Sequence, residues 1–188
     1  MNLKNFARNF SIDKRSGYTL VDVIRAIMFM SERHYGRISL TKKLGLCEAS
    51  VRTMLKKLKS VGLLTVSTKG HVLTKKGEEL AKNINRKIFS VRRFERPRFV
   101  KKSCVVFVVK GSAKKVKLGI EQRDEGMRFG SEIITLVYDG KNVKFPGTGE
   151  IVEGFEAPLS KNDVVIVSSG RRRVDMERGA LAAALTLI

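Results

Sequence analysis

The fold is decided by the stretch GRISLTKKLGLCEASVRTMLKKLKSVGLLTVSTKGHVLTKKG, which spans residues 36–77. After a short polar opening, the pattern predicts a helix of little more than one turn over residues 40–44, and Gly45 supplies a tight turn. A longer helix is predicted over residues 48–61, and Gly62 then stands where a helix can end at positive φ with little steric cost. Two helices joined by a tight turn therefore open this stretch.

The longer helix has one apolar face and one basic face. Its apolar positions follow the i, i+3, i+4, i+7 spacing of a buried helix face: Val51, Met54, Leu55 and Leu58. At about 100° per residue, the opposite face carries small, polar and basic side chains: Ala49, Arg52, Thr53, Lys56, Lys57 and Ser60. We therefore expect this helix to bury one side and to present a cationic surface on the other.

A hairpin and a further helix are predicted after Gly62. Residues 63–66 and 71–73 are predicted strands on either side of a polar tip at residues 67–70. Thr74 then opens a helix that the pattern continues to about Phe89. Its apolar positions are Leu80, Ile84 and Ile88.

Another helix is predicted upstream, over residues 19–34. Thr19 suits the N-cap position, and Asp22 three positions later can complete a capping box. Residues 1–16 are basic and form either an arm that docks through its few apolar residues or a disordered tail.

This order of helix, turn, basic helix, hairpin and helix resembles the winged helix-turn-helix family. The segments LTKKLGL, ASVRTMLKKLKSVGLL and LTKKGEEL carry the resemblance, which covers about residues 17–90. It implies that the basic helix lies in the major groove of double-stranded DNA, with Arg52 and Thr53 nearest the base edges. Lys69 at the wing tip would meet the backbone or an adjacent minor groove. The other DNA-binding candidates are phosphate contacts or their neighbours on the same surface: Lys42, Lys43, Ala49, Ser50, Lys56 and Lys57.

Cys47 departs from the family pattern, which usually has Ser or Thr at this helix start. A thiol accepts hydrogen bonds poorly, so the sequence predicts a weak N-cap. The alternative is a redox-sensing thiol, which a helix N-terminus favours.

The positive charge lies mostly in the first half of the chain. The net charge is +20; residues 1–99 hold 23 Lys and Arg against 7 Asp and Glu, whereas residues 100–188 hold 15 against 11. Such an excess favours a polyanionic partner for the first half. Mixed charges would better serve a surface whose only purpose is solubility.

A domain boundary is predicted at about residue 98, which gives domains 1–98 and 99–188. Pro97 prevents the preceding helix from continuing. Four arginines crowd this stretch and either hold phosphates beside the basic helix or solvate a linker: Arg92, Arg93, Arg96 and Arg98.

The second half is predicted to be a two-layer α+β sandwich. Its predicted strands are residues 103–109, 132–138, 142–145 and 163–168, and its predicted helices are residues 114–129 and 175–188. The order β-α-β-β-β-α places the helices on one side of a sheet. The fold class is therefore α+β, with an N-terminal winged helix-turn-helix followed by this sandwich.

The second half also resembles the C-terminal domain of archaeal winged-helix proteins whose function is not known. The segments GIEQRDEG, TLVYDGKNVKFPG, DVVIVSSG and ERGALAAALTL carry the resemblance, over most of residues 103–188. More loosely, the architecture is similar to the insert domain of bacterial aspartyl-tRNA synthetase and of the amidotransferase B subunit. That likeness carries no activity with it.

Two places in the second half are candidates for binding chemistry. Residues 121–125 gather three carboxylates that could perform acid–base work or hold a hard cation, or could form a solvated helix face. The second place lies between a strand and a helix start, where hydroxyls, backbone N–H groups and guanidiniums favour an anion. It consists of Ser168, Ser169, Gly170, Arg171, Arg172 and Arg173, and the alternative is an ordinary helix start with Asp175 as cap.

The composition argues against several classes of site and location. Two Cys and two His are too few for a structural zinc site, and nothing indicates an oxidising compartment for a disulfide between Cys47 and Cys104. The absence of an apolar run of 18 residues predicts a cytoplasmic protein. We find no reactive Ser motif or phosphate-loop motif, so the sequence predicts no metal, no cofactor and no enzymatic activity.

The leading hypothesis is a DNA-binding transcriptional regulator whose second domain dimerises or senses a small anionic effector. A homodimer would double the contacts with DNA, and its predicted surface is the closing helix, where Ala180, Ala183 and Ala184 permit close approach. Alternatively, this helix is buried within its own domain, beneath the sheet. The alternative is an RNA-binding or translation-associated protein, because winged helices also serve there. A third hypothesis is an enzyme with an anion-binding α+β domain.

Overall fold

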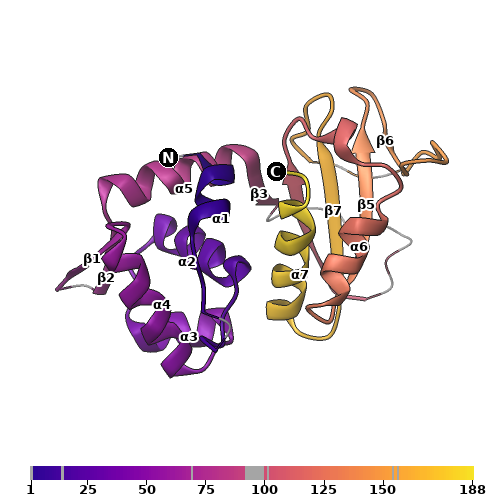
Figure 1. Ribbon diagram of the computed structural model, residues 1–188. Coiled ribbons are helices and arrows are strands. Elements are labelled where there is room, and N and C mark those ends of the chain that lie inside the picture. Colours follow the sequence, from indigo (N-terminus) through magenta and orange to yellow (C-terminus); the bar gives the residue numbers. More distant parts are fainter. Residues whose placement is uncertain are drawn as a thin grey trace. The chain divides into compact units, whose positions relative to one another are not determined.

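The protein is an α+β molecule that divides into two compact units, Met1–Asn85 and Arg86–Ile188 (Figure 1). The computed structural model describes residues 2–13, 15–68, 70–91, 100, 102–153, 155 and 157–188. Among these residues, none of the helices is both long and apolar enough to cross a bilayer. The predicted fold class is confirmed.

The first unit has the predicted order of elements, preceded by a short helix. Its elements are α1 (Leu3–Asn9), α2 (Leu20–Glu32), α3 (Arg37–Leu44), α4 (Glu48–Ser60), β1 (Leu64–Ser67), β2 (Gly70–Leu73) and α5 (Lys75–Lys87). β1 and β2 pair antiparallel, and an isolated bridge joins Tyr35 to His71 of β2. The helix-turn-helix formed by α3 and α4 is thus followed by a hairpin and a helix, as expected of a winged helix.

Local sequence signals explain where these helices begin and which side they bury. Asp22 accepts a hydrogen bond from the backbone N–H of Thr19 at 2.9 Å, so the predicted capping box forms at the start of α2. The predicted apolar face of α4 is buried as a whole: Val51, Met54, Leu55 and Leu58. Periodicity therefore placed the main helices of this unit correctly.

The N-terminal segment docks on the first unit rather than remaining a tail. Leu3 and Phe6 of α1 are buried, and the rings of Phe6 and Phe10 lie 4.9 Å apart. Asn2 caps the helix by accepting a hydrogen bond from the N–H of Lys4. Burial of these apolar groups is what holds so short a helix in place.

The second unit is one antiparallel sheet in the order β3-β4-β7-β5-β6 with two helices on one face. Its strands are β3 (Ile88–Val91), β4 (Cys104–Val109), β5 (Glu132–Tyr138), β6 (Val143–Lys144) and β7 (Val164–Ser169). Its helices are a short 3₁₀ turn at Ala113–Lys115, α6 (Ile120–Met127) and α7 (Arg173–Leu185). α7 contacts β4, β5 and β7, while α6 contacts β5 and α7.

The other face of this sheet is covered by loop residues. Strand alternation sends Val165 and Val167 of β7 to that face, where they join a buried apolar cluster. Val152 and the partly buried Phe155 and Leu159 pack there from the loop before β7. The sheet is therefore buried on both sides, which agrees with the continuous apolar runs of β4 and β7.

The predicted boundary at about residue 98 differs from the structure. α5 ends at Lys87, and Ile88 begins a strand that pairs with β4 in the second unit, with Ile88 opposite Val109. Ile88 lies one helical turn beyond Ile84, so helical spacing alone extended the helix too far. The division between the units falls at residues 85 and 86, and the predicted linker arginines, Arg92, Arg93, Arg96 and Arg98, lie outside the described residues.

The helix predicted over residues 114–129 is in fact two short pieces. A 3₁₀ turn ends at Lys115, and α6 begins only at Ile120. Gly119 lies between them with φ of 78°, a left-handed conformation that interrupts the helix.

The closing helix does not offer the predicted dimer surface. Ala180, Ala183 and Ala184 of α7 are fully buried within the chain, and so is Leu187 beyond the helix. Their small side chains serve the packing of α7 against the sheet and α6 instead. Homodimerisation itself stays a prediction.

Gly179 tests how tightly α7 is packed. A Cβ at this position would overlap the hydroxyl of Ser131 and press on the carbonyl of Gly126. We expect Gly179→Ala to destabilise the second unit by about 1–3 kcal/mol despite the better helix propensity of Ala. Urea unfolding should show a smaller cost of the same change in a Ser131→Ala background, because the clashing oxygen is then absent. Equal costs in both backgrounds would contradict this packing.

Candidate nucleic-acid interface

The exposed face of α4 is small, polar and cationic. Ala49, Arg52, Thr53 and Lys56 are all exposed, as predicted from the helical projection. Lys56 makes no ion pair or hydrogen bond with any described residue. A cation without a partner in the chain keeps its full charge available to an anionic ligand.

Arg52 is oriented by a shared carboxylate. Its Nη2 lies 3.1 Å from Oε1 of Glu48 one turn earlier, and Nη2 of Arg37 in α3 lies 3.1 Å from the same oxygen. Arg52 remains 66% exposed, and a guanidinium has five N–H donors, so most of them stay free. Glu48 therefore aligns two arginines on α3 and α4 without neutralising both.

Thr53 is turned toward its own helix. Its hydroxyl donates to the carbonyl of Ala49 at 3.0 Å, which leaves the oxygen as an acceptor toward solvent.

Ser50 does not belong to the exposed face. Only 7% of it is exposed, because Gly17 packs directly against its hydroxyl, which also lies 3.1 Å from Sγ of Cys47. Lys57, two turns later, is half-buried with Nζ 3.4 Å from the hydroxyl of Ser11. The sequence prediction overlooked both contacts because the pattern within α4 does not show that Ser11 and Gly17 pack against it.

The lysines of α3 and of the wing tip have different surroundings. Lys42 is exposed, whereas Nζ of Lys43 lies 4.8 Å from the ring centre of Phe29 in α2. A cation over an aromatic face is stabilised there, so Lys43 is the less available of the two. Lys69 lies outside the described residues.

The turn between α3 and α4 is held by a buried arginine that the sequence prediction missed. Arg25 of α2 is 2% exposed, and its Nη1 donates to the carbonyl of Leu44 at 3.2 Å, at the end of α3. The carboxylate of Asp22, also fully buried, lies 3.9 Å from the same nitrogen. Gly45 follows at φ of 70° and its N–H bonds to Thr41. The sequence did contain a signal for this role, namely a charged residue among the apolar positions of the helix that becomes α2.

The strand β2 brings a histidine close to this surface. The N–H of His71 donates to the carbonyl of Tyr35 at 3.0 Å, which ties the hairpin to the start of α3. Burial lowers the pKa of His71, and the nearby charges of Arg37 and Lys59 lower it further. His71 is therefore neutral at pH 7.

Several residues of the candidate anion site in the second unit already contact other residues of the chain. Ser168 is fully buried on the sheet, and the hydroxyl of Ser169 lies 3.3 Å from Glu132. Arg172 pairs with Asp175 at 2.7 Å, and Arg173 pairs with Glu177 at 2.8 Å. Both guanidiniums remain largely exposed, and the N-cap of α7 is Arg172, not Asp175 as the alternative had it, so the anion site stays a prediction. Gly170 and Arg171 complete the loop between Ser169 and α7.

The carboxylates of residues 121–125 lie on the exposed side of α6. Asp124 pairs with Arg123 at 3.2 Å, and Glu125 pairs with Arg128 at 2.9 Å. Within the described part of the chain, no three Cys, His, Asp or Glu residues gather in a way that could hold a metal ion. Cys47 and Cys104 do not form a disulfide with each other.

Two family models match the chain. Residues 19–79 match the model described as "PH0730-like, N-terminal domain", and residues 100–187 match the "Domain of unknown function (DUF4443)". The chain is also similar to the solved structure "Hypothetical protein PH0730 from Pyrococcus horikoshii OT3", with 24% identity and a TM-score of 0.73 over 90% of this chain and 92% of that one. At this identity the likeness shows a shared fold with an archaeal protein, which agrees with the archaeal resemblance found in the sequence. No curated protein matches the chain at a significant level.

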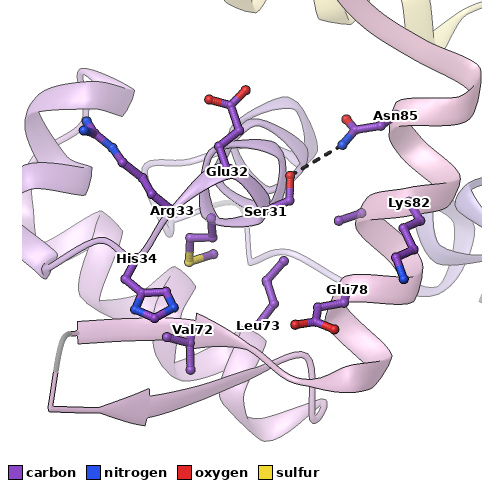
Figure 2. Close-up of a pocket in the computed structure, with 11 residues that line it drawn as sticks. Ser31, Glu32, Arg33, His34, Val72, Leu73, Glu78, Lys82 and Asn85 are labelled. Carbon is purple, nitrogen blue, oxygen red and sulfur yellow. Dashed lines mark hydrogen bonds between the residues drawn. The ribbon is translucent and has the colours of Figure 1, made fainter.

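The first unit also has a cavity of about 350 Å³ between the end of α2, β2 and α5 (Figure 2). Glu78 and Lys82 line it from α5, and Asn85 donates to the hydroxyl of Ser31 at 3.5 Å. These polar side chains are exposed and of mixed charge. The cavity therefore has no built set of ligand contacts.

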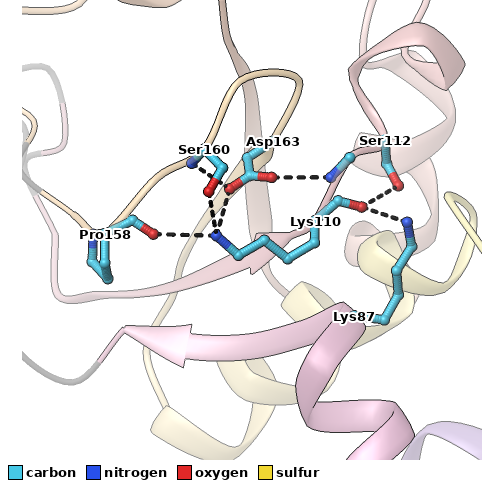
Figure 3. Close-up of polar contacts among 7 residues, drawn as sticks. Lys87, Lys110, Ser112, Pro158, Ser160 and Asp163 are labelled. Carbon is cyan, nitrogen blue, oxygen red and sulfur yellow. Dashed lines mark hydrogen bonds and ion pairs between the residues drawn. The ribbon is translucent and has the colours of Figure 1, made fainter. Parts of the chain in front are cut away.

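A polar network closes one end of the second unit's sheet (Figure 3). The buried carboxylate of Asp163 accepts from Nζ of Lys110 at 2.8 Å, from the N–H of Gly111 at 3.0 Å and from the N–H of Ser160 at 2.8 Å. Lys87, at the end of α5, donates to the carbonyl of Lys110, and burial lowers its pKa. With each carboxylate oxygen bonded, this cluster fixes loops rather than offering a catalytic group.

Cys47 tests the capping argument for α4. Its side chain makes no capping hydrogen bond, and contact with Ser50 lowers the pKa of its thiol. We expect Cys47→Ser to stabilise the first unit by about 0.5–1 kcal/mol, because a hydroxyl accepts from the free N–H groups of the first turn. Thermal unfolding of this variant and of Cys47→Ala measures the effect. The alanine variant supplies no acceptor, so an equal gain from both would contradict the argument.

Proposed function

We propose that the first unit binds double-stranded DNA and that the protein acts as a transcriptional regulator. The observation that supports this most strongly is the exposed face of α4, where Arg52, Thr53 and Lys56 lie opposite a fully buried apolar face. In a winged helix this is the face that enters the major groove. This face combines side-chain types that read base edges with side-chain types that contact phosphates.

The distribution of charge supports the same partner. The first unit, residues 1–85, carries 17 of the 38 Lys and Arg and only 6 of the 18 Asp and Glu. A field of this sign attracts nucleic acid at long range and makes the affinity depend steeply on salt.

The second unit is proposed to dimerise or to sense a ligand. It is a separate compact unit with its own buried sheet. At the loop before α7, Arg172 and Arg173 remain largely exposed, and an anionic effector there would compete with Asp175 and Glu177 for their guanidiniums.

RNA is the alternative partner, because the positive charge of the first unit attracts RNA as well as DNA. The face of α4 favours duplex DNA, because the deep and narrow major groove of RNA helices does not admit a helix. Sequencing the nucleic acids crosslinked to the full-length protein should recover a recurring double-stranded DNA site. Recovery of structured RNA in place of DNA would overturn the proposal.

Two substitutions on α4 separate base reading from phosphate binding. We expect Arg52→Ala to weaken binding to the recovered site by about 1–3 kcal/mol and to relax the base preference locally. Lys56→Ala should weaken all duplexes alike and lower the slope of log K against log salt by about one. Fluorescence anisotropy with specific and scrambled duplexes measures both. If Arg52→Ala leaves affinity and preference unchanged, the assigned face of α4 is wrong.

A further inference from the structure

Residues 11–13 and 15–17, here called the flanking segment, lie along one side of α4. At one end Nζ of Lys57 lies 3.4 Å from the hydroxyl of Ser11. At the other end Gly17 touches Ser50 so closely that a Cβ on Gly17 would overlap the serine hydroxyl. Ser50 and Lys57 are about two helical turns apart, so the segment runs antiparallel to α4 over most of the helix. Figure 1 shows the indigo chain leaving α1 before α2 begins.

The flanking segment is held by its own hydrogen bonds. The carboxylate of Asp13 accepts from the N–H of Arg15 at 2.8 Å, and the N–H of Ser16 donates to the carbonyl of Asp13 at 3.0 Å. The hydroxyl of Ser16 donates to the same carbonyl at 2.6 Å. Tyr18, which follows, is buried. The segment therefore has a defined position beside α4, with the charge of Asp13 directed at its own backbone.

This position leaves one cation exposed next to α4. The side chain of Arg15 is exposed and makes no ion pair or hydrogen bond with any described residue. Nothing in the packing of the first unit requires it, and exposed arginines without a structural partner are suited to phosphate.

The geometry points to a second nucleic-acid contact: we propose that the flanking segment meets the phosphate backbone at the wall of the groove that α4 enters, with Arg15 as the phosphate ligand. The inference rests on the proposed function of α4. A helix about 10–12 Å across fills a major groove about 12 Å wide, so whatever lies on its flank faces a backbone strand. The contact is independent of base sequence and sets the register of α4.

The test is a salt titration of duplex binding by the full-length protein, with a fluorescent duplex of mixed sequence as the probe. Loss of one phosphate contact lowers the slope of log K against log salt by about 0.9, which corresponds to roughly a fifteenfold loss of affinity at 50 mM salt and a fourfold loss at 200 mM. We expect Arg15→Ala to show this loss on every duplex alike and Arg15→Lys to retain most of the slope.

The matched control is Lys117→Ala, which removes the same charge from an exposed position of the second unit. It reports the effect of net charge alone. If Arg15→Ala behaves like Lys117→Ala while Arg52→Ala still weakens specific binding, the flanking segment is not a contact and the proposed function stands. If the wild-type protein shows no salt-dependent affinity for any duplex, the proposed function fails and the inference fails with it.

Discussion

The first unit depends on the buried hydrogen bond from Arg25 to the carbonyl of Leu44. That carbonyl ends α3 and has no partner within its own helix, and Arg25 reaches it from α2 with Asp22 beside its charge. Removing one member of such a group leaves a buried charge or carbonyl uncompensated, which costs far more than an exposed ion pair. The contact fixes where α3 stops, so Gly45 can turn the chain and α4 can begin with its apolar face toward the core.

With the position of α4 fixed, the parts of the chain that pack against it decide which of its side chains stay exposed. The core takes one face and the flanking segment takes another through Ser50 and Lys57. The side that remains exposed includes Arg52, Thr53 and Lys56. The N-terminal segment thus covers part of α4, and Arg15 of that segment is itself exposed.

The second unit also contains a buried carboxylate whose hydrogen bonds hold neighbouring loops. Its buried carboxylate, Asp163, has both oxygens bonded, and Lys87 at the end of α5 bonds the carbonyl of Lys110 next to that site. Because β3 begins at the very next residue, α5 runs directly into the sheet. At the start of α7, Arg172 pairs with Asp175 and Arg173 pairs with Glu177, and both guanidiniums stay largely exposed.

The sequence by itself determined the α+β class, the order of elements around α4 and the two faces of that helix. Helical and strand periods are local properties, and the residues that set them lie within a few positions of one another. Only the tertiary structure decided that Ser50 is covered, that Ile88 starts a strand and that Ala183 faces its own chain. Each of these outcomes depends on a partner from elsewhere in the chain: Gly17 for Ser50, Val109 for Ile88, and the sheet with α6 for α7. Local periodicity does not predict such contacts. Where a residue suits either a helix or a strand, packing against distant residues decides between them.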